Sequence, residues 1–236
     1  RDSEDGQAQA DLNRLMDGTF SNQEAGMPEG TVHSELLRRP GKLYVLASHF
    51  HPDHFNKEVL QWREQRPDII YIFSKDILRH RRAQKEDAVW LKKGEEYKDE
   101  TLSVRAFGST DVGVSFLLQA GGKKIFHAGD LNNWHWMDES TEAEWKGAEK
   151  NFLHELDDLY AYTPEVDVAM FPVDPRLGKE YMRGAGQFVT KIKTHIFVPM
   201  HFTPEYAKAN AFRDFAEAHG VRFVSLTHRG QKIEIE

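Results

Sequence analysis

The 236-residue sequence contains no cysteine. Disulfide bonds, zinc sites built on thiolates and cysteine nucleophiles are therefore excluded, and any metal has to be bound by nitrogen and oxygen ligands. No apolar run approaches the roughly 20 residues that a membrane-spanning helix needs. The polar start of the chain, RDSEDGQAQADLN, lacks the pattern of a signal peptide, which favours a cytoplasmic protein.

The sequence also lacks an excess of positive charge. Its 31 Lys and Arg residues against 38 Asp and Glu residues give a net charge of −7, so no global basic field attracts nucleic acid or an anionic membrane. A small-molecule substrate is therefore favoured over nucleic acid. With 39% hydrophobic residues, the chain is long enough to bury one sizeable core, and residues 1–236 are predicted to form a single domain.

Predicted strands and helices alternate in both halves of the chain, with a β-rich stretch between them. Apolar or alternating runs predict strands over 42–48, 69–73, 102–108, 113–120, 123–130, 166–173, 195–200, 222–226 and 232–236. Helical patterns predict helices over 7–17, 32–39, 56–65, 75–83, 141–160, 178–193 and 204–219. Sheets covered by helices predict a layered α/β architecture.

Polar side chains gather directly after the first predicted strand. The stretch ASHFHPDHFNKE contains His49, His51, Asp53 and His54 within six positions. In an extended segment His49 and His51 point to the same side, and Pro52 then redirects the chain, so that Asp53 and His54 can face a second position. One loop can in this way serve two metal ions.

Other predicted strands end on residues of the same kind. The strand over 123–130 ends on Asp130, the strand over 166–173 is followed by Asp174, and the strand over 195–200 is followed by His201. Ligand sites in α/β sheets form beyond the carboxyl ends of strands, so these side chains are expected to meet at one edge. Imidazole nitrogens and carboxylate oxygens bind Zn²⁺, Mn²⁺ or Fe²⁺, which predicts one or two such ions as cofactors.

Three motifs together resemble those of the metallo-β-lactamase superfamily. They are HFHPDH at 49–54, IFHAGD at 125–130 and VPMHF at 198–202. Their order and spacing agree over about residues 42–202, and the branch most similar is the group of metal-dependent hydrolases related to ascorbate-phosphate lactonases. The resemblance implies an αββα sandwich with a metal centre between the sheet edges. It also implies six metal ligands, which are His49, His51, Asp53, His54, Asp130 and His201.

The resemblance further implies how these ligands are shared. His49 and His51 would bind the first metal, Asp130 would bridge both metals, and the other three ligands would bind the second metal. The implied activity is a hydrolase in which a metal-bound hydroxide attacks a small ester, lactone or phosphoester. Asp53 is the candidate proton acceptor, although a carboxylate that binds a metal is a poorer base.

The chain departs from the superfamily pattern in two places. Members usually carry another histidine for the first metal between the signature and the bridging aspartate, whereas this chain has GSTDVGVSF there. Ser109 is nearest to that position by spacing, and the candidates for an extra or outer ligand are Asp111, His135 and Asp174. Members also usually begin with a β-hairpin, and no such pair of strands is predicted before the first strand of this chain.

Several functional alternatives stay open at this point. Arg176, Arg183 and Trp134 are candidates for contact with a substrate, because they lie near the predicted strand ends. A phosphodiesterase or nuclease acting on nucleic acid is one alternative to the small-molecule hydrolase. A non-catalytic metal-binding scaffold is another, and the replaced histidine favours it.

Overall fold

The computed structural model describes residues 31–202 and 204–235. The chain divides into two compact units, unit 1 with Arg1–Leu91 and Thr227–Glu236, and unit 2 with Lys92–Leu226. The helix predicted over 7–17 lies outside the described residues, as does most of the segment in which a β-hairpin would precede the first strand. Among the residues described, no helix combines the length and the apolar character needed to cross a membrane.

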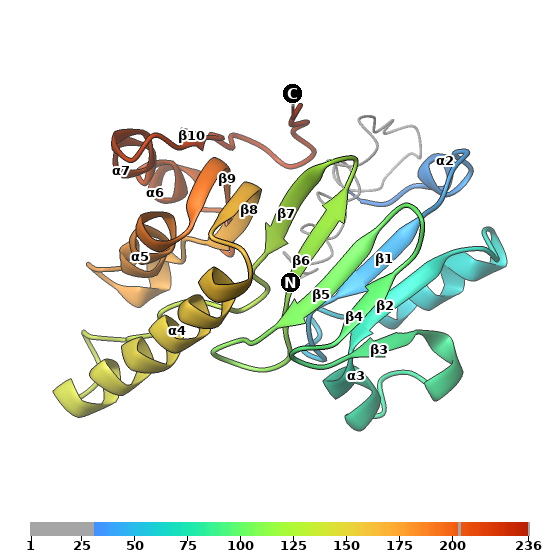
Figure 1. Cartoon of the computed structure of the whole chain (residues 1–236), viewed down its shortest axis with the longest axis horizontal. Helices are drawn as coiled ribbons and strands as arrows, with labels where there is room; N and C mark the ends of the chain where they lie inside the picture. The colour runs from blue at the N-terminus through green and yellow to red at the C-terminus, as the bar shows by residue number, and fades with distance from the viewer. Residues whose placement is uncertain (1–30, 203, 236) are drawn as a thin grey trace. The chain divides into compact units, whose positions relative to one another are not determined.

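Unit 1 is built on a three-stranded parallel sheet in the order β1-β2-β3. Its strands are β1 (Tyr44–Ala47), β2 (Ile70–Ser74) and β3 (Val89–Leu91). Its helices are α2 (Ser34–Leu37) and α3 (Lys75–Arg79), together with the 3-10 helices η1 (Lys57–Glu64) and η2 (Lys85–Asp87). Figure 1 shows these elements in blue to green. Strands β1 and β2 confirm the strands predicted over 42–48 and 69–73. Strand β3 was not predicted, because it is too short to show a hydrophobic pattern. The helix predicted over 56–65 is present as a 3-10 helix.

The core of unit 1 lies beneath the segment that carries the histidines. Val45 of β1 and Phe73 of β2 are fully buried. Phe55, which directly follows His54, packs edge to face on Phe73 with ring centroids 5.2 Å apart. The loop is therefore anchored on both sides, by β1 before it and by the Phe55 side chain after it.

A buried arginine fixes the chain that leads into β1. The guanidinium of Arg66 donates hydrogen bonds to the carbonyl oxygens of Leu37 at 3.1 Å and Arg39 at 2.6 Å, and also to that of Gly41. These carbonyls lie at the end of α2 and in the turn that follows it. The planar guanidinium group of one side chain thus satisfies carbonyl oxygens at the end of the helix and in the turn that follows it.

Arg66→Ala is expected to lower the free energy of unfolding by about 2–4 kcal/mol, because the buried carbonyl of Leu37 left without a donor costs roughly 1–3 kcal/mol and the part-buried carbonyls of Arg39 and Gly41 cost less. Arg66→Lys is expected to lose most of the same free energy, since a single ammonium group cannot reproduce the planar guanidinium group. Urea unfolding of both variants beside the wild type measures the effect. A lysine variant as stable as the wild type would contradict this account.

Unit 2 contains a seven-stranded sheet in the order β10-β9-β8-β7-β6-β5-β4. The strands are β4 (Glu96–Lys98), β5 (Ser103–Phe107), β6 (Ser115–Ala120), β7 (Lys123–His127), β8 (Glu165–Pro172), β9 (Lys193–Met200) and β10 (Arg222–Phe223). Strands β4 to β7 are antiparallel, which confirms the predicted β-rich middle, and β7 to β10 are parallel. Gly121 and Gly122, with φ of 56° and 76°, form the predicted hairpin turn between β6 and β7.

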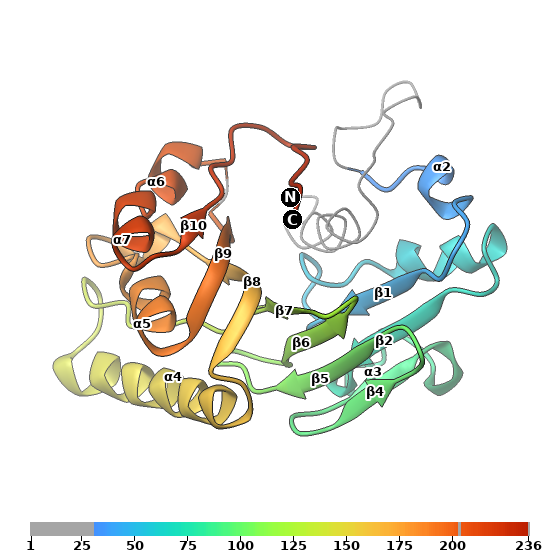
Figure 2. The ribbon, with the colours of Figure 1, turned by 45° about the horizontal axis from the view of Figure 1, so that its top comes forward.

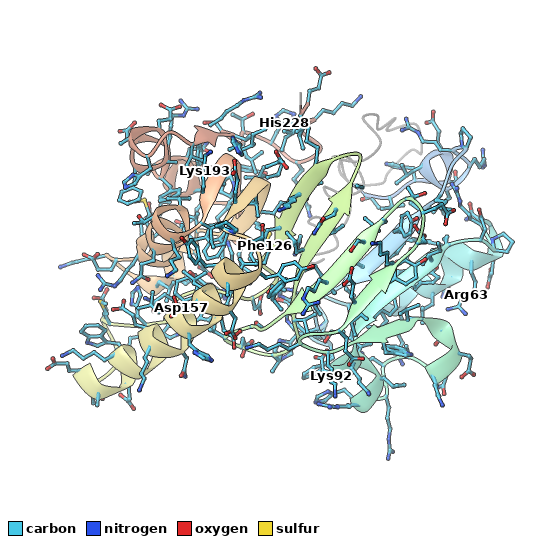
Figure 3. The ribbon with its side chains drawn as sticks, viewed as in Figure 1. Arg63, Lys92, Phe126, Asp157, Lys193 and His228 are labelled. Atoms are coloured by element: carbon cyan, nitrogen blue, oxygen red, sulfur yellow. The ribbon has the colours of Figure 1, made fainter. Side chains whose placement is uncertain are left out.

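Helices cover the parallel half of this sheet. They are α4 (Glu142–Tyr162), α5 (Arg183–Lys191), α6 (Tyr206–Asn210), α7 (Arg213–Ala218) and the 3-10 helix η3 (Pro175–Leu177). Figure 2 shows α4 and α5 beside each other along the sheet. Phe171 of β8 lies 6.1 Å from Phe152 of α4 and 4.7 Å from Phe188 of α5, measured between ring centroids. Phe126 of β7, labelled in Figure 3, stacks on Phe188 at 5.5 Å, so aromatic side chains fill the space under both helices.

Two predicted elements near the end of the chain are wrong. The helix predicted over 204–219 is split into α6 and α7, and Phe212 between them is fully buried against Phe197 of β9 and Phe223 of β10. The chain turns where this ring enters the core, which interrupts the helix. The strand predicted over 232–236 is absent from residues 232–235, because an alternating pattern does not by itself supply a neighbouring strand for the backbone hydrogen bonds.

Candidate metal centre

The histidine loop of unit 1 is closed by its own backbone. The chain leaves β1 at Ala47 and makes a turn that begins after His51. The N–H groups of His54 and Phe55 both donate to the carbonyl oxygen of His51, at 2.9 and 2.8 Å. Pro52 lies inside this turn, where its fixed φ favours a change of direction. The turn brings His54 back towards the histidines that precede it.

Three imidazole rings of this loop lie together. The ring centroid of His49 is 4.8 Å from that of His51 and 3.7 Å from that of His54. His49 and His54 are buried, and Nδ1 of His49 lies 3.0 Å from the hydroxyl of Ser48, so His49 would offer Nε2 to a metal. Protonated rings at these distances would repel one another, whereas neutral rings present lone pairs to a cation. The donor set therefore fits a divalent ion that prefers nitrogen ligands.

Asp53 is the exposed candidate ligand of the same loop. Its side chain is 56% exposed, and its Oδ2 lies 3.8 Å from Nε2 of His54. The carboxylate is therefore beside a buried imidazole and open to solvent at the same time. This position suits a metal ligand that can also exchange a proton with water.

Three strand ends of unit 2 meet at one edge of its sheet. Strands β7, β8 and β9 are parallel, and Asp130, Asp174 and His201 follow them. Nε2 of His201 lies 3.1 Å from Oδ1 of Asp130, and its Nδ1 lies 3.0 Å from Oδ2 of Asp174. Two ligands on one tetrahedral ion, with bonds of about 2.0–2.2 Å, stand roughly 3.3 Å apart. The spacing of Asp130 and His201 therefore fits joint binding of one ion.

Left-handed backbone conformations present two of these side chains. Gly129, directly before Asp130, has φ of 55°, and His201 itself has φ of 63°. Glycine adopts this region without strain, which explains the Gly in the AGD motif. A histidine in this region costs of order 1 kcal/mol or more, and such strain is concentrated at functional sites. His201 is thus held by the fold in a conformation that histidine does not favour.

Asp174 lies behind His201. Its side chain is fully buried, and its carboxylate accepts hydrogen bonds from Nε of Arg176 at 3.0 Å and from Nη2 of Arg176 at 2.6 Å. Burial alone raises the pKa of Asp174, but the hydrogen bonds from His201 and Arg176 outweigh it and lower the pKa to about 2. The carboxylate therefore stays charged at neutral pH and is committed to these two partners, which makes it a support for His201.

The other candidates for the replaced histidine have different surroundings. Nε2 of His135 lies 3.0 Å from the carbonyl oxygen of Glu180, and its Nδ1 accepts the N–H of Met137 at 3.1 Å. Backbone groups thus use both ring nitrogens of His135, which leaves neither for a metal. Asp111 is exposed, and its backbone N–H faces the hydroxyl of Ser109 at 3.4 Å.

Thr110, in the same GSTDVGVSF stretch, holds the loop that follows Asp130. Its hydroxyl donates to the carbonyl oxygen of Asn132 at 2.5 Å and accepts the N–H of Asn132 at 3.0 Å. Trp134 donates its indole N–H to the carbonyl oxygen of Asp130 at 2.7 Å, and its ring lies 5.4 Å from that of His201. Both contacts use the backbone of the loop, so they restrict the position of the Asp130 carboxylate.

Arg183 belongs to a network within unit 2 that the sequence does not reveal. Glu149 of α4 accepts hydrogen bonds from Arg183 at 3.1 Å, from Asn133 at 2.8 Å and from Gln187 at 3.0 Å. The hydrogen bond from Arg183, aided by those from Gln187 and Asn133 and opposed by burial, lowers the pKa of Glu149 to about 2. The charge of Arg183 is therefore neutralised by Glu149. The only signal in the sequence is the polar pair Asn132–Asn133 after a buried strand.

Glu149→Gln is expected to be less stable than the wild type by about 2 kcal/mol at pH 7, because the variant lacks the charge that Arg183 pairs with. The folded-state pKa of Glu149 is depressed, so its stabilisation is complete above the ordinary pKa and is lost as the pH falls. The difference in unfolding free energy between the two proteins should therefore narrow from about pH 5 towards pH 2. Urea unfolding at a series of pH values measures it, and a difference independent of pH would contradict the assignment.

Comparison with known sequences decides the family. The family described as the β-lactamase superfamily domain matches residues 31–202 of the chain. The chain belongs to the metallo-β-lactamase superfamily. The mixed α/β structure predicted for a member of this superfamily is confirmed by both units. The narrower branch of ascorbate-phosphate lactonases is not confirmed and stays a prediction.

Three solved structures are similar in fold to this chain at low sequence identity. A provisionally assigned metal-dependent hydrolase from Parabacteroides distasonis is 16% identical, with a TM-score of 0.55 over 83% of this chain and 80% of that chain. YhfI from Bacillus subtilis, a metallo-β-lactamase fold protein, is 12% identical, with a TM-score of 0.53 over 80% of this chain and 76% of that chain. CmlA, a diiron β-hydroxylase from Streptomyces venezuelae, is 13% identical, with a TM-score of 0.52 over 84% of this chain and 45% of that chain. No curated protein matches the sequence significantly. Likeness at these identities concerns the fold alone.

Proposed function

We propose that the protein is a metal-dependent hydrolase that acts on a small ester, lactone or phosphoester. The observation that carries the proposal is the packing of three imidazoles in the loop 49–54, with ring centroids 3.7 and 4.8 Å from that of His49. Rings this close can supply nitrogen ligands to one or two ions of Zn²⁺, Mn²⁺ or Fe²⁺. Membership of the metallo-β-lactamase superfamily supports hydrolysis as the reaction class.

The proposed ligands follow the order of the superfamily motifs in the sequence. His49 and His51 are assigned to one ion, and Asp130 is assigned to both. The second ion takes the remaining donors, which are Asp53, His54 and His201. Ions of this kind polarise a carbonyl or phosphoryl oxygen and lower the pKa of a bound water to about 7.

Groups of the chain itself would orient these donors and serve the reaction. Ser48 engages Nδ1 of His49, and Asp174 engages Nδ1 of His201, so each ring is directed to use its Nε2. Asp53, which is open to solvent, is proposed to accept the proton of the attacking water. Arg176 is 58% exposed while paired with Asp174, which leaves it able to meet a negatively charged group of a substrate.

A non-catalytic metal-binding protein is the second candidate. The stretch with Ser109 and Thr110 supplies no histidine, and His135 uses both ring nitrogens elsewhere, which favours this candidate. The first ion would then have two histidines and one carboxylate. Three protein ligands with a fourth, open position are nevertheless the usual arrangement of catalytic zinc sites, so the hydrolase is preferred. A nuclease is disfavoured by the net charge of −7.

Metal analysis of the purified protein, combined with a substrate panel, tests the proposal. We expect about one or two equivalents of metal per chain and turnover of a lactone, ester or small phosphoester that stops on chelation and returns with added ion. A protein that holds its metal and hydrolyses nothing in the panel would support the scaffold instead. Turnover of polynucleotides alone would support the nuclease. Failure to bind metal, with no activity in added Zn²⁺ or Mn²⁺, would reject the hydrolase.

A further inference from the structure

The residue between the first two histidines is held by α3. The backbone N–H of Phe50 donates a hydrogen bond to Oδ2 of Asp76 at 3.0 Å, across 26 positions of the sequence. Asp76 is the second residue of α3, which directly follows the neighbouring strand β2. The N–H in question belongs to the peptide group that joins His49 to Phe50. The contact with Asp76 therefore fixes the orientation of that peptide group.

The ring of Phe50 is fixed by the same helix. His80, which caps α3, stacks on Phe50 with ring centroids 3.6 Å apart and planes inclined by 6°. His80 is itself held in place, because its N–H and its Nδ1 both approach the carbonyl oxygen of Asp76 at 2.9 Å. Asp76 thus holds Phe50 twice, through its carboxylate on the amide and through its carbonyl and His80 on the ring.

Fixing Phe50 also fixes the direction of its two neighbours. The backbone of Phe50 joins His49 to His51, so a fixed peptide group at Phe50 limits the directions that both imidazoles can take. The ring of Phe50 also lies 4.5 Å from the ring of His51. Metal–nitrogen distances tolerate errors of only about 0.2 Å, so a small rotation of the peptide at Phe50 would spoil the position of both imidazoles.

We infer that Asp76 is a positioning residue for the histidine loop, which holds the Phe50 amide so that His49 and His51 are presented to the metal. The inference rests on the proposed function, since it requires these two histidines to bind metal. The other carboxylate oxygen of Asp76, Oδ1, is buried and accepts no hydrogen bond within the described residues. Within the described residues, the carboxylate of Asp76 therefore accepts a single hydrogen bond, which comes from the N–H of Phe50.

Metal binding by four variants tests this inference on the full chain. The variants are Asp76→Ala, which removes the acceptor, Asp76→Asn, which keeps one, His80→Ala, which removes the stacked ring, and Glu86→Ala, which removes an exposed acid of η2 as a matched control. The measurements are the Zn²⁺ dissociation constant from chelator competition, the visible spectrum of the Co²⁺ form and the melting temperature of the metal-free protein. The Co²⁺ spectrum reports ligand geometry, which a merely stabilising residue would leave unchanged.

Asp76→Ala is expected to raise the Zn²⁺ dissociation constant about 10-fold and to change the Co²⁺ spectrum, with a shift of only a few degrees in melting temperature. Asp76→Asn should recover most of the affinity, His80→Ala should show a smaller rise of about 3-fold, and Glu86→Ala should match the wild type. Wild-type affinity and spectrum in Asp76→Ala would overturn the inference, as would equal losses in the Ala and Asn variants. If Asp76→Ala does not fold, an unchanged spectrum in His80→Ala would overturn it. A wild type that binds no metal would instead reject the proposed function itself.

Discussion

Asp130→Asn is expected to remove tightly bound metal and to reduce turnover to the background rate. The carboxylate is 8% exposed, and its Oδ1 lies 3.1 Å from Nε2 of His201. An amide of the same shape carries no charge and is a weak metal ligand. Because Asp130 is assigned to both ions, the substitution should weaken metal binding by more than the 10–100-fold that follows from removing a residue that only hydrogen-bonds to a ligand. Metal analysis after dialysis, together with the hydrolysis rate on the best substrate of the panel, measures both effects.

The fold should survive this substitution. The carbonyl oxygen of Asp130 accepts from the indole of Trp134, and this contact uses the backbone, which the variant keeps. The metal-free forms of the variant and the wild type should therefore melt within a few degrees of each other. Asp214→Asn, on an exposed position of α7, is the matched control and should keep its metal. Unchanged metal content in Asp130→Asn would contradict the ligand assignment.

The sequence predicts the parts of the site that depend on local order. A buried strand followed by three histidines and an aspartate indicates a ligand loop without knowledge of any distant partner. The parallel order of β7, β8 and β9 similarly follows from alternating strands and helices, and it brings Asp130, Asp174 and His201 to one edge of unit 2. The meeting of these three side chains could therefore be predicted, since the carboxyl ends of parallel strands lie at the same edge of a sheet.

Contacts between distant segments were not predictable in the same way. Asp76 is 26 positions from Phe50, and Glu149 is 34 positions from Arg183. Asp76 lies in the first turn of α3 and Glu149 lies within α4, and acidic residues are common at both kinds of position. No local sequence pattern therefore marks them as partners of Phe50 and Arg183. The role of Asp174 was open for a similar reason. A carboxylate after a strand suits a metal ligand or a support for one, and the hydrogen bonds that Asp174 accepts from His201 and Arg176 favour the support.

Asp174→Asn is expected to weaken metal binding about 10–100-fold while leaving every assigned ligand in place. In the wild type the charged carboxylate accepts the Nδ1–H of His201 at 3.0 Å, which fixes the tautomer that directs Nε2 towards Asp130. An amide in its place carries no charge and can also present an N–H₂ group to Nδ1, which would favour the opposite tautomer. His201 would then lose both the correct proton position and part of its basicity. Zinc affinity, measured by chelator competition, reports this effect.

A loss of stability alone would not produce the same result, so two further measurements separate the explanations. The Co²⁺ spectrum of Asp174→Asn should change, because His201 would meet the ion at a different angle. Arg176→Gln is the matched variant, since it removes the other partner of the same carboxylate but leaves the bond between Asp174 and His201. It should lose some folding free energy and keep most of its metal affinity. If Asp174→Asn and Arg176→Gln lowered the zinc affinity equally, the cause would be the change in charge around Asp174. The proposed role of Asp174 in orienting His201 would then be rejected.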